Sequence, residues 1–268
     1  MTEHREWTVT GHAGEISART WPNPRGYWLA VLVHGYGEHI GRYQHVADAL
    51  VEAGAAVVGH DHAGHGQSAG DRVLINDFER VVDDQHLVIQ RARQEYPDIP
   101  LILIGHSLGG MIATRYAQRH IDELAALVLS GPVLGSWYPL DLLEYDEIPE
   151  TPIDVATLSR DETVGDAYAA DPLVWHGPFR RPTLEAIDDC LYTINFAGAF
   201  GDDVPALWMH GDDDELVPIA DTRAGMDRIR GLGFEEIIYP GARHEIFNET
   251  NYKDVLADLT AFVRGVLG

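Results

Sequence analysis

A serine lies between two glycines at the point where an apolar run changes into a helical pattern. The run at residues 101–104 leads directly into GHSLG (residues 105–109), and helical spacing follows over residues 111–118. The pattern G-x-S-x-G predicts a sharp turn from a strand to a helix, which strains the serine backbone and presents its hydroxyl group. The beginning of that helix offers free N–H groups to an oxyanion. We therefore predict that Ser107 is a nucleophile in acyl transfer.

A serine hydroxyl is a weak nucleophile and needs a base, which an acid must orient. Enzymes that use this turn carry the acid and then the histidine after the serine in the chain. His244, in YPGARHEIF, is the predicted base. In GDDDE (residues 211–215) we choose Asp214 as the acid, because this acid commonly follows the strand-ending glycine by three positions. Asp213 is the alternative, and Asp212 is expected to belong to a solvated loop.

The oxyanion of the tetrahedral intermediate needs two backbone N–H donors. One is expected from Leu108, the residue after the nucleophile. The other is expected from the loop HGYG (residues 34–37) after the run VLV, where we choose the N–H of Tyr36.

Three histidines in GHDHAGHGQS suggest a rival chemistry. His60, His62 and His65 lie close enough in sequence to suggest a zinc hydrolase. The interspersed glycines favour a tight turn after a strand, and no later Asp/His pair completes a metal set with suitable spacing. We therefore expect a serine mechanism that needs no metal and no cofactor.

The elements that position these groups follow from short apolar runs. They lie at residues 29–33, 55–58, 101–104, 124–129, 206–209 and 235–239, and most are continuous rather than alternating, as in strands buried on both faces. Helical patterns lie at residues 45–53, 78–95, 111–118, 220–229 and 255–266. This alternation predicts an α/β fold with a mostly parallel sheet and helices on both faces. The first thirty residues predict an antiparallel hairpin at one edge.

The alternation breaks between residues 131 and 203, a segment rich in proline. It is too long for a structureless loop. We predict that residues 131–203 form an inserted, largely helical cap over the carboxyl ends of the strands, and that residues 1–130 and 204–268 form the core.

Composition excludes several classes of protein. The chain has 268 residues and a formal net charge of −24, so it has nothing with which to neutralise the phosphates of a nucleic acid. Cys190 is the single cysteine, which excludes a disulfide framework within one chain. The polar beginning and the lack of a long apolar run predict a cytoplasmic protein.

Several stretches together resemble one family. The sequence is similar to the monoacylglycerol lipase group of α/β hydrolases, which is related to bacterial lysophospholipases. The matching stretches are HGYGEHIGRY (34–43), DHAGHGQSAG (61–70), GHSLGG (105–110), LSRDETVGDAYAADPLVWHG (158–177), GDDDELVP (211–218) and YPGARHEIFNE (239–249).

The resemblance implies a serine esterase that hydrolyses monoacylglycerols through an acyl-enzyme. It assigns the triad to Ser107, Asp214 and His244 and the oxyanion donors to Tyr36 and Leu108. Glu38 is interpreted as shaping its loop through hydrogen bonds, or else as a surface residue, and it is a candidate for contact with substrate. Further candidates lie in the early cap. Its apolar residues are expected either to line the acyl entrance and touch a membrane or micelle, or to pack against the core as in an ordinary helix: Trp137, Tyr138 and Leu142.

The motifs leave other functions open. A lysophospholipase, another carboxylesterase or thioesterase, or an aminopeptidase of the same fold would share the triad. A non-catalytic binding protein on the same scaffold would usually lack one of the three residues.

Overall fold

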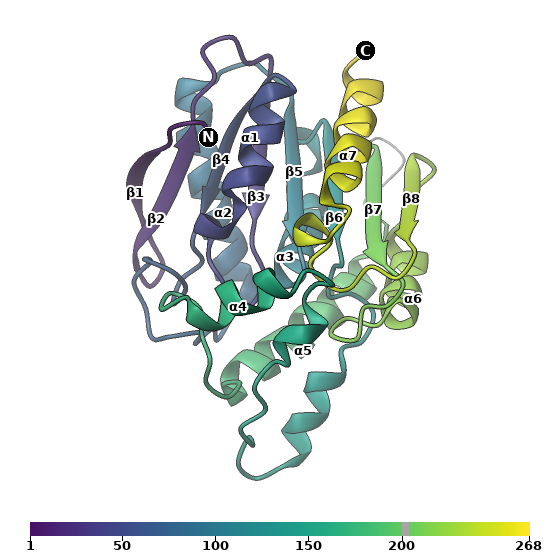
Figure 1. The fold of residues 1–268 in the computed structure, drawn as a ribbon. Helices are drawn as coiled ribbons and strands as arrows, with labels where there is room; N and C mark the ends of the chain where they lie inside the picture. Colours follow the sequence, from purple (N-terminus) through teal and green to yellow (C-terminus); the bar gives the residue numbers. More distant parts are fainter. Residues whose placement is uncertain (200–203) are drawn as a thin grey trace.

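A computed structural model describes residues 1–199 and 204–268. Its centre is an eight-stranded sheet in the order β1-β2-β4-β3-β5-β6-β7-β8 (Figure 1). All neighbours from β4 to β8 are parallel, whereas β1 and β2 form an antiparallel hairpin at one edge. The predicted fold class and the predicted edge hairpin are therefore confirmed. The strands are β1 (Arg5–Gly11), β2 (Gly14–Trp21), β3 (Trp28–Val33), β4 (Ala55–His60), β5 (Leu101–His106), β6 (Ala126–Ser130), β7 (Ala206–Gly211) and β8 (Phe234–Tyr239).

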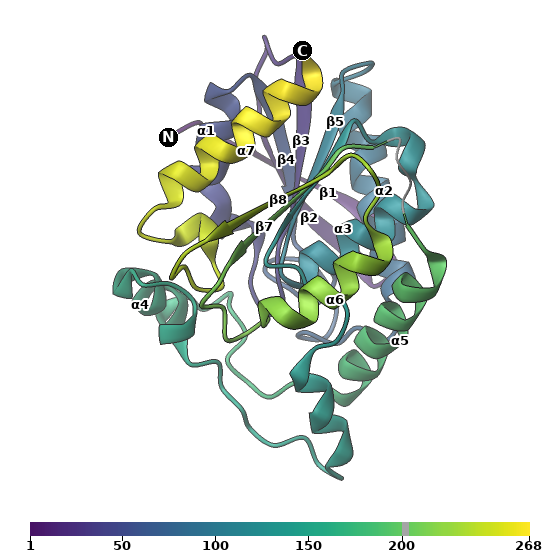
Figure 2. The ribbon, with the colours of Figure 1, turned by 90° about the vertical axis from the view of Figure 1, so that its right-hand side faces the viewer.

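Two helical layers enclose the sheet (Figure 2). The helices α1 (Gln44–Glu52) and α7 (Tyr252–Leu267) pack on one face, and α2 (Phe78–Glu95), α3 (Leu108–Arg119) and α6 (Ile219–Ile229) pack on the other. Every residue of β3 to β7 is buried, because helices cover both faces of these strands. This burial explains why these strands read as continuous apolar runs in the sequence.

The segment between β6 and β7 lies at the carboxyl ends of the strands (Figure 1). It contains the 3-10 helices η3 (Tyr138–Glu144) and η4 (Val155–Thr157) and the α-helices α4 (Glu162–Ala170) and α5 (Arg181–Ala197). Helix α5 buries Leu184, Ile187 and Leu191 in the same apolar cluster as α2 and α3. Much of the segment is 3-10 or irregular, and residues 200–203 lie outside the described residues. A separate cap over residues 131–203 stays a prediction.

Among the helices of residues 1–199 and 204–268, none is both long enough and apolar enough to cross a bilayer.

Candidate active site

The turn between β5 and α3 holds Ser107 in an unusual backbone conformation. Its φ of 55° and ψ of −122° lie outside the regions that most residues adopt. A Cβ at position 109 would overlap the carbonyl oxygens of Val33 and His34, so the helix approaches β3 this closely only with glycine there. The predicted turn is therefore present, and α3 begins at Leu108, directly after the serine.

Replacing Gly109 by alanine is expected to destabilise the protein strongly. The new methyl group would have to displace the backbone of β3 or push α3 away from it, and overpacking of this kind typically costs at least about 1–3 kcal/mol. Gly265→Ala is the matched control. A Cβ there meets nothing within 4 Å inside α7, so this variant should gain about 0.5–1 kcal/mol. Urea unfolding of both variants measures the difference, and equal stabilities would contradict the steric argument.

Three side chains from distant parts of the chain form one hydrogen-bonded series. The Nε2 atom of His244 lies 2.9 Å from the Oγ atom of Ser107, and its Nδ1 atom lies 2.8 Å from Oδ2 of Asp214. Asp214 follows β7 and His244 follows β8, so both reach the edge of the sheet where β5 ends. All three residues are buried. The structure thus brings together the three residues predicted as the triad, and it places Asp214 rather than Asp213 against the imidazole.

The carboxylate of Asp214 is held by more groups than the sequence indicated. Its Oδ1 atom accepts the backbone N–H groups of Leu216 (3.0 Å) and Val217 (2.8 Å). Its Oδ2 atom lies 3.1 Å from Nε2 of His210. Burial alone would raise the pKa of Asp214, but the contacts with His244 and His210 hold it well below its usual value. Asp214 is therefore an anion at neutral pH.

His210 is a residue that the sequence reasoning missed. Its Nδ1 atom accepts a hydrogen bond from the indole of Trp208 (3.0 Å), so its proton is on Nε2, which faces both Val217 O and Asp214. His210 thereby supports Asp214 as a neutral donor. The one available signal was its position four residues before the acid, at the end of an apolar run.

The environment of His244 suits a base. Burial alone would lower the pKa of His244, but the negative charge of Asp214 and the hydrogen bond to it outweigh burial and raise this pKa. Because Asp214 accepts the proton on Nδ1, the neutral imidazole presents an unprotonated Nε2 to the serine hydroxyl. The arrangement can therefore accept the Ser107 proton.

The loop after β3 lies against the nucleophile. A Cβ on Gly35 would be 3.1 Å from Cβ and 3.5 Å from Oγ of Ser107. The N–H of Gly35 donates to Oε1 of Glu38 (2.7 Å), and the ring of Tyr36 stacks on Phe179 with a centroid distance of 4.7 Å. This loop and Leu108 therefore flank the hydroxyl, while the roles of the Tyr36 and Leu108 amides as oxyanion donors stay predictions.

A buried ion network joins the loop after β3 to the loop that carries His244. Arg42 Nη1 lies 2.6 Å from Glu38 Oε2 and 2.7 Å from Glu245 Oε1, and Nη2 lies 2.8 Å from Glu245 Oε2. The hydroxyl of Tyr43 also donates to Glu38. Glu245 is the neighbour of His244, so Arg42 connects the Gly35 loop to the histidine loop. The alternative that Glu38 is a surface residue is wrong, because its carboxylate is buried and satisfied.

Replacing Arg42 by methionine is expected to lower the free energy of unfolding by about 3–5 kcal/mol at pH 7, because it leaves two buried carboxylates without their cation. Burial raises the pKa of Glu38 and Glu245, but Arg42 outweighs it and holds both pKa values low. The loss should therefore diminish as the pH falls and both carboxyls take up protons.

Arg230→Met removes an exposed ion pair with Asp227 and should cost at most about 1 kcal/mol. Denaturant titrations of both variants at pH 7 and pH 4.5 provide the comparison. An Arg42 variant as stable as the Arg230 variant would contradict the argument.

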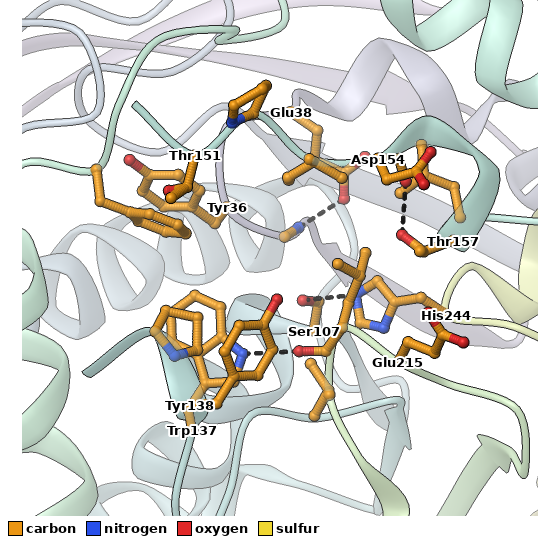
Figure 3. A pocket seen from close by; sticks show the side chains of 18 of the residues that line it. Tyr36, Glu38, Ser107, Trp137, Tyr138, Thr151, Asp154, Thr157, Glu215 and His244 are labelled. Atoms are coloured by element: carbon orange, nitrogen blue, oxygen red, sulfur yellow. Dashed lines mark hydrogen bonds between the residues drawn. The ribbon is translucent and has the colours of Figure 1, made fainter. Parts of the chain in front are cut away.

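A cavity of about 440 Å³ ends at Ser107 and His244 (Figure 3). The substrate-contact candidates Glu38, Trp137, Tyr138 and Leu142 all line it. Trp137, a candidate for contact with a membrane or micelle, is only 7% exposed, and its indole N–H donates to Leu216 O. Tyr138 is 50% exposed and stands where the cavity meets solvent.

The histidines of the rival zinc hypothesis pack beneath the loop of residues 34–37. His62 donates its backbone N–H to Nε2 of His34, and the ring pairs His60–His62 and His62–His65 meet edge to face. Burial lowers the pKa of His60 and of His65 to about 4, so both are neutral at pH 7. In the described part of the chain, one group of three side chains has its ligand atoms within 4.8 Å of one another, and this group consists of His86, His120 and Glu123. It includes none of His60, His62 and His65. The zinc hypothesis therefore has no support in their geometry.

Comparison with known proteins shows which family the chain belongs to. The family model described as serine aminopeptidase, S33, matches residues 25–251. The chain is 37% identical over 258 residues to the monoacylglycerol lipase of Mycolicibacterium smegmatis, covering 90% of this chain and 89% of that protein. It is 35% identical over 240 residues to the human monoglyceride lipase, covering 82% and 76%.

Solved structures show the same fold. A soluble variant of the monoglyceride lipase of Saccharomyces cerevisiae, bound to a substrate analogue, superimposes with a TM-score of 0.88 at 21% identity, over 99% of this chain and 96% of that one. A carboxyl esterase of Bacillus coagulans, bound to glycerol, gives a TM-score of 0.84 at 25% identity over the whole of both chains. The chain therefore belongs to the serine aminopeptidase S33 family of α/β hydrolases.

Proposed function

We propose that this protein is a serine esterase that hydrolyses monoacylglycerols to glycerol and a fatty acid. The observation that carries the proposal is the hydrogen-bonded series Ser107–His244–Asp214 at the buried end of a largely apolar cavity. The names of the relatives support the substrate class, because two proteins at least 35% identical to this chain are called monoacylglycerol or monoglyceride lipases.

The geometry supports a mechanism in two steps. In the first, Oγ of Ser107 attacks the ester carbonyl while Nε2 of His244 takes its proton. The N–H groups of Tyr36 and Leu108 stabilise the oxyanion, Asp214 stabilises the imidazolium, and glycerol leaves with the proton from His244. In the second, His244 removes a proton from the water that attacks the acyl-enzyme, and it then returns this proton to Oγ of Ser107 as the fatty acid leaves.

The segment between β6 and β7 serves as the cap over this cavity in our proposal. It supplies apolar lining from Trp137, Leu142 and Phe179 to receive an acyl chain. Tyr138 and Tyr145, which are 50% and 57% exposed at the cavity mouth, are the groups proposed to touch a membrane or micelle surface during substrate entry.

The test is an assay of the purified protein on monoacylglycerols of graded chain length. Matched lysophospholipids and acyl thioesters form two further arms of the assay. Amino-acid amides form another, because the family is described as a serine aminopeptidase. We expect kcat/KM to be highest for a monoacylglycerol. Turnover of amino-acid amides without any turnover of monoacylglycerols would overturn the proposal.

A further inference from the structure

The chemical nature of the lining residues differs between the buried end of the cavity and its mouth. Its buried lining is mostly apolar around Ser107 and His244. At the mouth, three exposed acids contribute to the lining: Asp141 from η3, Asp154 before η4, and Glu215 directly after the triad acid. A substrate that reaches Ser107 from solvent through this mouth therefore passes these carboxylates.

No positive charge in the lining offsets these acids. Among the described residues that line the cavity, none is a lysine or an arginine. The sequence carries six acidic residues and neither Lys nor Arg between residues 131 and 159. Within residues 1–199 and 204–268, Asp141, Asp154 and Glu215 take part in none of the ion pairs found. The Asp154 carboxylate accepts the N–H of Ala156, which leaves its negative charge in place.

The arginines near the cavity are engaged elsewhere, and Arg180, which follows the lining residue Phe179, lies over the ring of Trp175. Arg42 is held between two buried glutamates, and the triad Glu38–Arg42–Glu245 keeps a net charge of −1. Arg181 donates to main-chain carbonyls at the end of η3, and Arg243 donates to the carbonyls of Ala156 and Ser159 behind η4. A phosphate at the mouth would therefore meet carboxylates rather than a cation.

We propose that this mouth selects substrates by charge. It admits esters whose leaving group is neutral or cationic and rejects those whose leaving group is anionic, and Asp141, Asp154 and Glu215 set the selectivity. A cleft lined by charges of one sign concentrates their potential, and such fields change association rates by about 10- to 10³-fold. This inference rests on the proposed function and specifies its substrates: a glycerol ester is accepted, whereas the same ester carrying a phosphate monoester is not.

The experiment compares three octanoyl esters below their micellar concentrations, so that no lipid surface contributes. They are octanoylcholine, 1-octanoylglycerol and 1-octanoylglycerol 3-phosphate, with cationic, neutral and anionic leaving groups. At about 20 mM ionic strength we expect kcat/KM for the phosphate ester to be at least about tenfold below that for octanoylglycerol. In about 1 M NaCl the difference should shrink, because the screening length falls to about 3 Å.

Two triple variants assign the effect to the mouth. Asp141→Asn/Asp154→Asn/Glu215→Gln neutralises the three mouth acids, and asparagine at position 154 retains an oxygen for the N–H of Ala156. Glu52→Gln/Asp122→Asn/Glu235→Gln neutralises three exposed acids near the amino ends of β4, β6 and β8, at the opposite edge of the sheet. Each variant changes the net charge from −24 by three units, to −21. The ratio of kcat/KM for the phosphate ester to that for octanoylglycerol should rise at least fivefold in the first variant only.

The outcomes separate the two proposals. If wild-type protein cleaves none of the esters, the proposed esterase function fails. If it cleaves all three with similar kcat/KM at low salt, the function stands and charge selection is overturned. An equal rise of the ratio in both triple variants would show that net charge, and not the mouth acids, sets the preference.

Discussion

Ser107→Ala is expected to lower kcat for monoacylglycerol hydrolysis on the order of 10⁵- to 10⁶-fold. Removing the nucleophile of a serine hydrolase eliminates the acyl-enzyme route, and what remains comes from binding and from the oxyanion donors. The alanine retains the backbone turn but loses the Oγ atom that lies 2.9 Å from His244. Initial rates on a monoacylglycerol, measured at enzyme concentrations that span several decades, determine the residual activity.

Covalent labelling gives a second readout for Ser107. A fluorophosphonate should label the wild-type protein at this residue and should not label the alanine variant. Ser136→Ala is the matched control: Ser136 is exposed and its hydroxyl forms none of the hydrogen bonds found within residues 1–199 and 204–268, so this variant should be labelled like the wild type. Near-normal hydrolysis by Ser107→Ala, with its thermal unfolding unchanged, would mean that another group attacks the ester.

Asp214→Asn is expected to lower kcat by about 10⁴-fold, which is the effect of this substitution in the serine-protease triad. An asparagine amide donates to Nδ1 of His244 and leaves the imidazole proton on Nε2, so the nitrogen that faces Ser107 has no lone pair for the incoming proton. Asp213→Asn is the matched control. Asp213 is exposed and one residue away, and it was the alternative choice of acid. Its variant should retain activity within about threefold of the wild type, since its side chain does not contact the imidazole.

The wild type and Asp214→Asn should also differ in the pH dependence of kcat/KM, and the direction of the difference can be predicted. The base must be neutral, so kcat/KM should fall about tenfold per pH unit below the pKa of His244. In the wild type the Asp214 charge raises this pKa, which moves the acid limb to higher pH than for a free imidazole. In Asp214→Asn burial remains and lowers the pKa of His244, so the limb should move to lower pH while the plateau drops. A limb that stays in place would contradict the assigned role of Asp214.

The sequence by itself determined the parts of this protein that are encoded locally. Continuous apolar runs predicted the parallel strands to within two residues at each end, because burial on both faces requires such runs. The glycines around Ser107 indicated the strained turn, because only a glycine at position 109 allows α3 to approach β3. Since the carboxyl ends of parallel strands meet at one edge, the positions of Asp214 and His244 after their strands indicated a common site.

The tertiary structure alone decided which side chains meet. The contacts that build the site join residues 30, 137 and 203 positions apart, namely Asp214 with His244, Ser107 with His244, and Arg42 with Glu245. Local patterns place residues at one edge of the sheet but do not show which side chains touch. The sequence therefore left Asp213 open beside Asp214 and gave no reason to connect Glu38 to Glu245. His210 was missed although it lies only four residues from Asp214, because only the folded loop after β7 brings its Nε2 atom to the carboxylate.

The segment between β6 and β7 shows the same limit most clearly. Its many prolines and short helices lack a period, so its path over the site and the burial of Trp137 could not be read from the sequence. The six acids between residues 131 and 159 were visible as charges, but only folding places Asp141 and Asp154 at the same mouth as Glu215. A charge acts through its distance from other groups, and only the folded chain sets those distances.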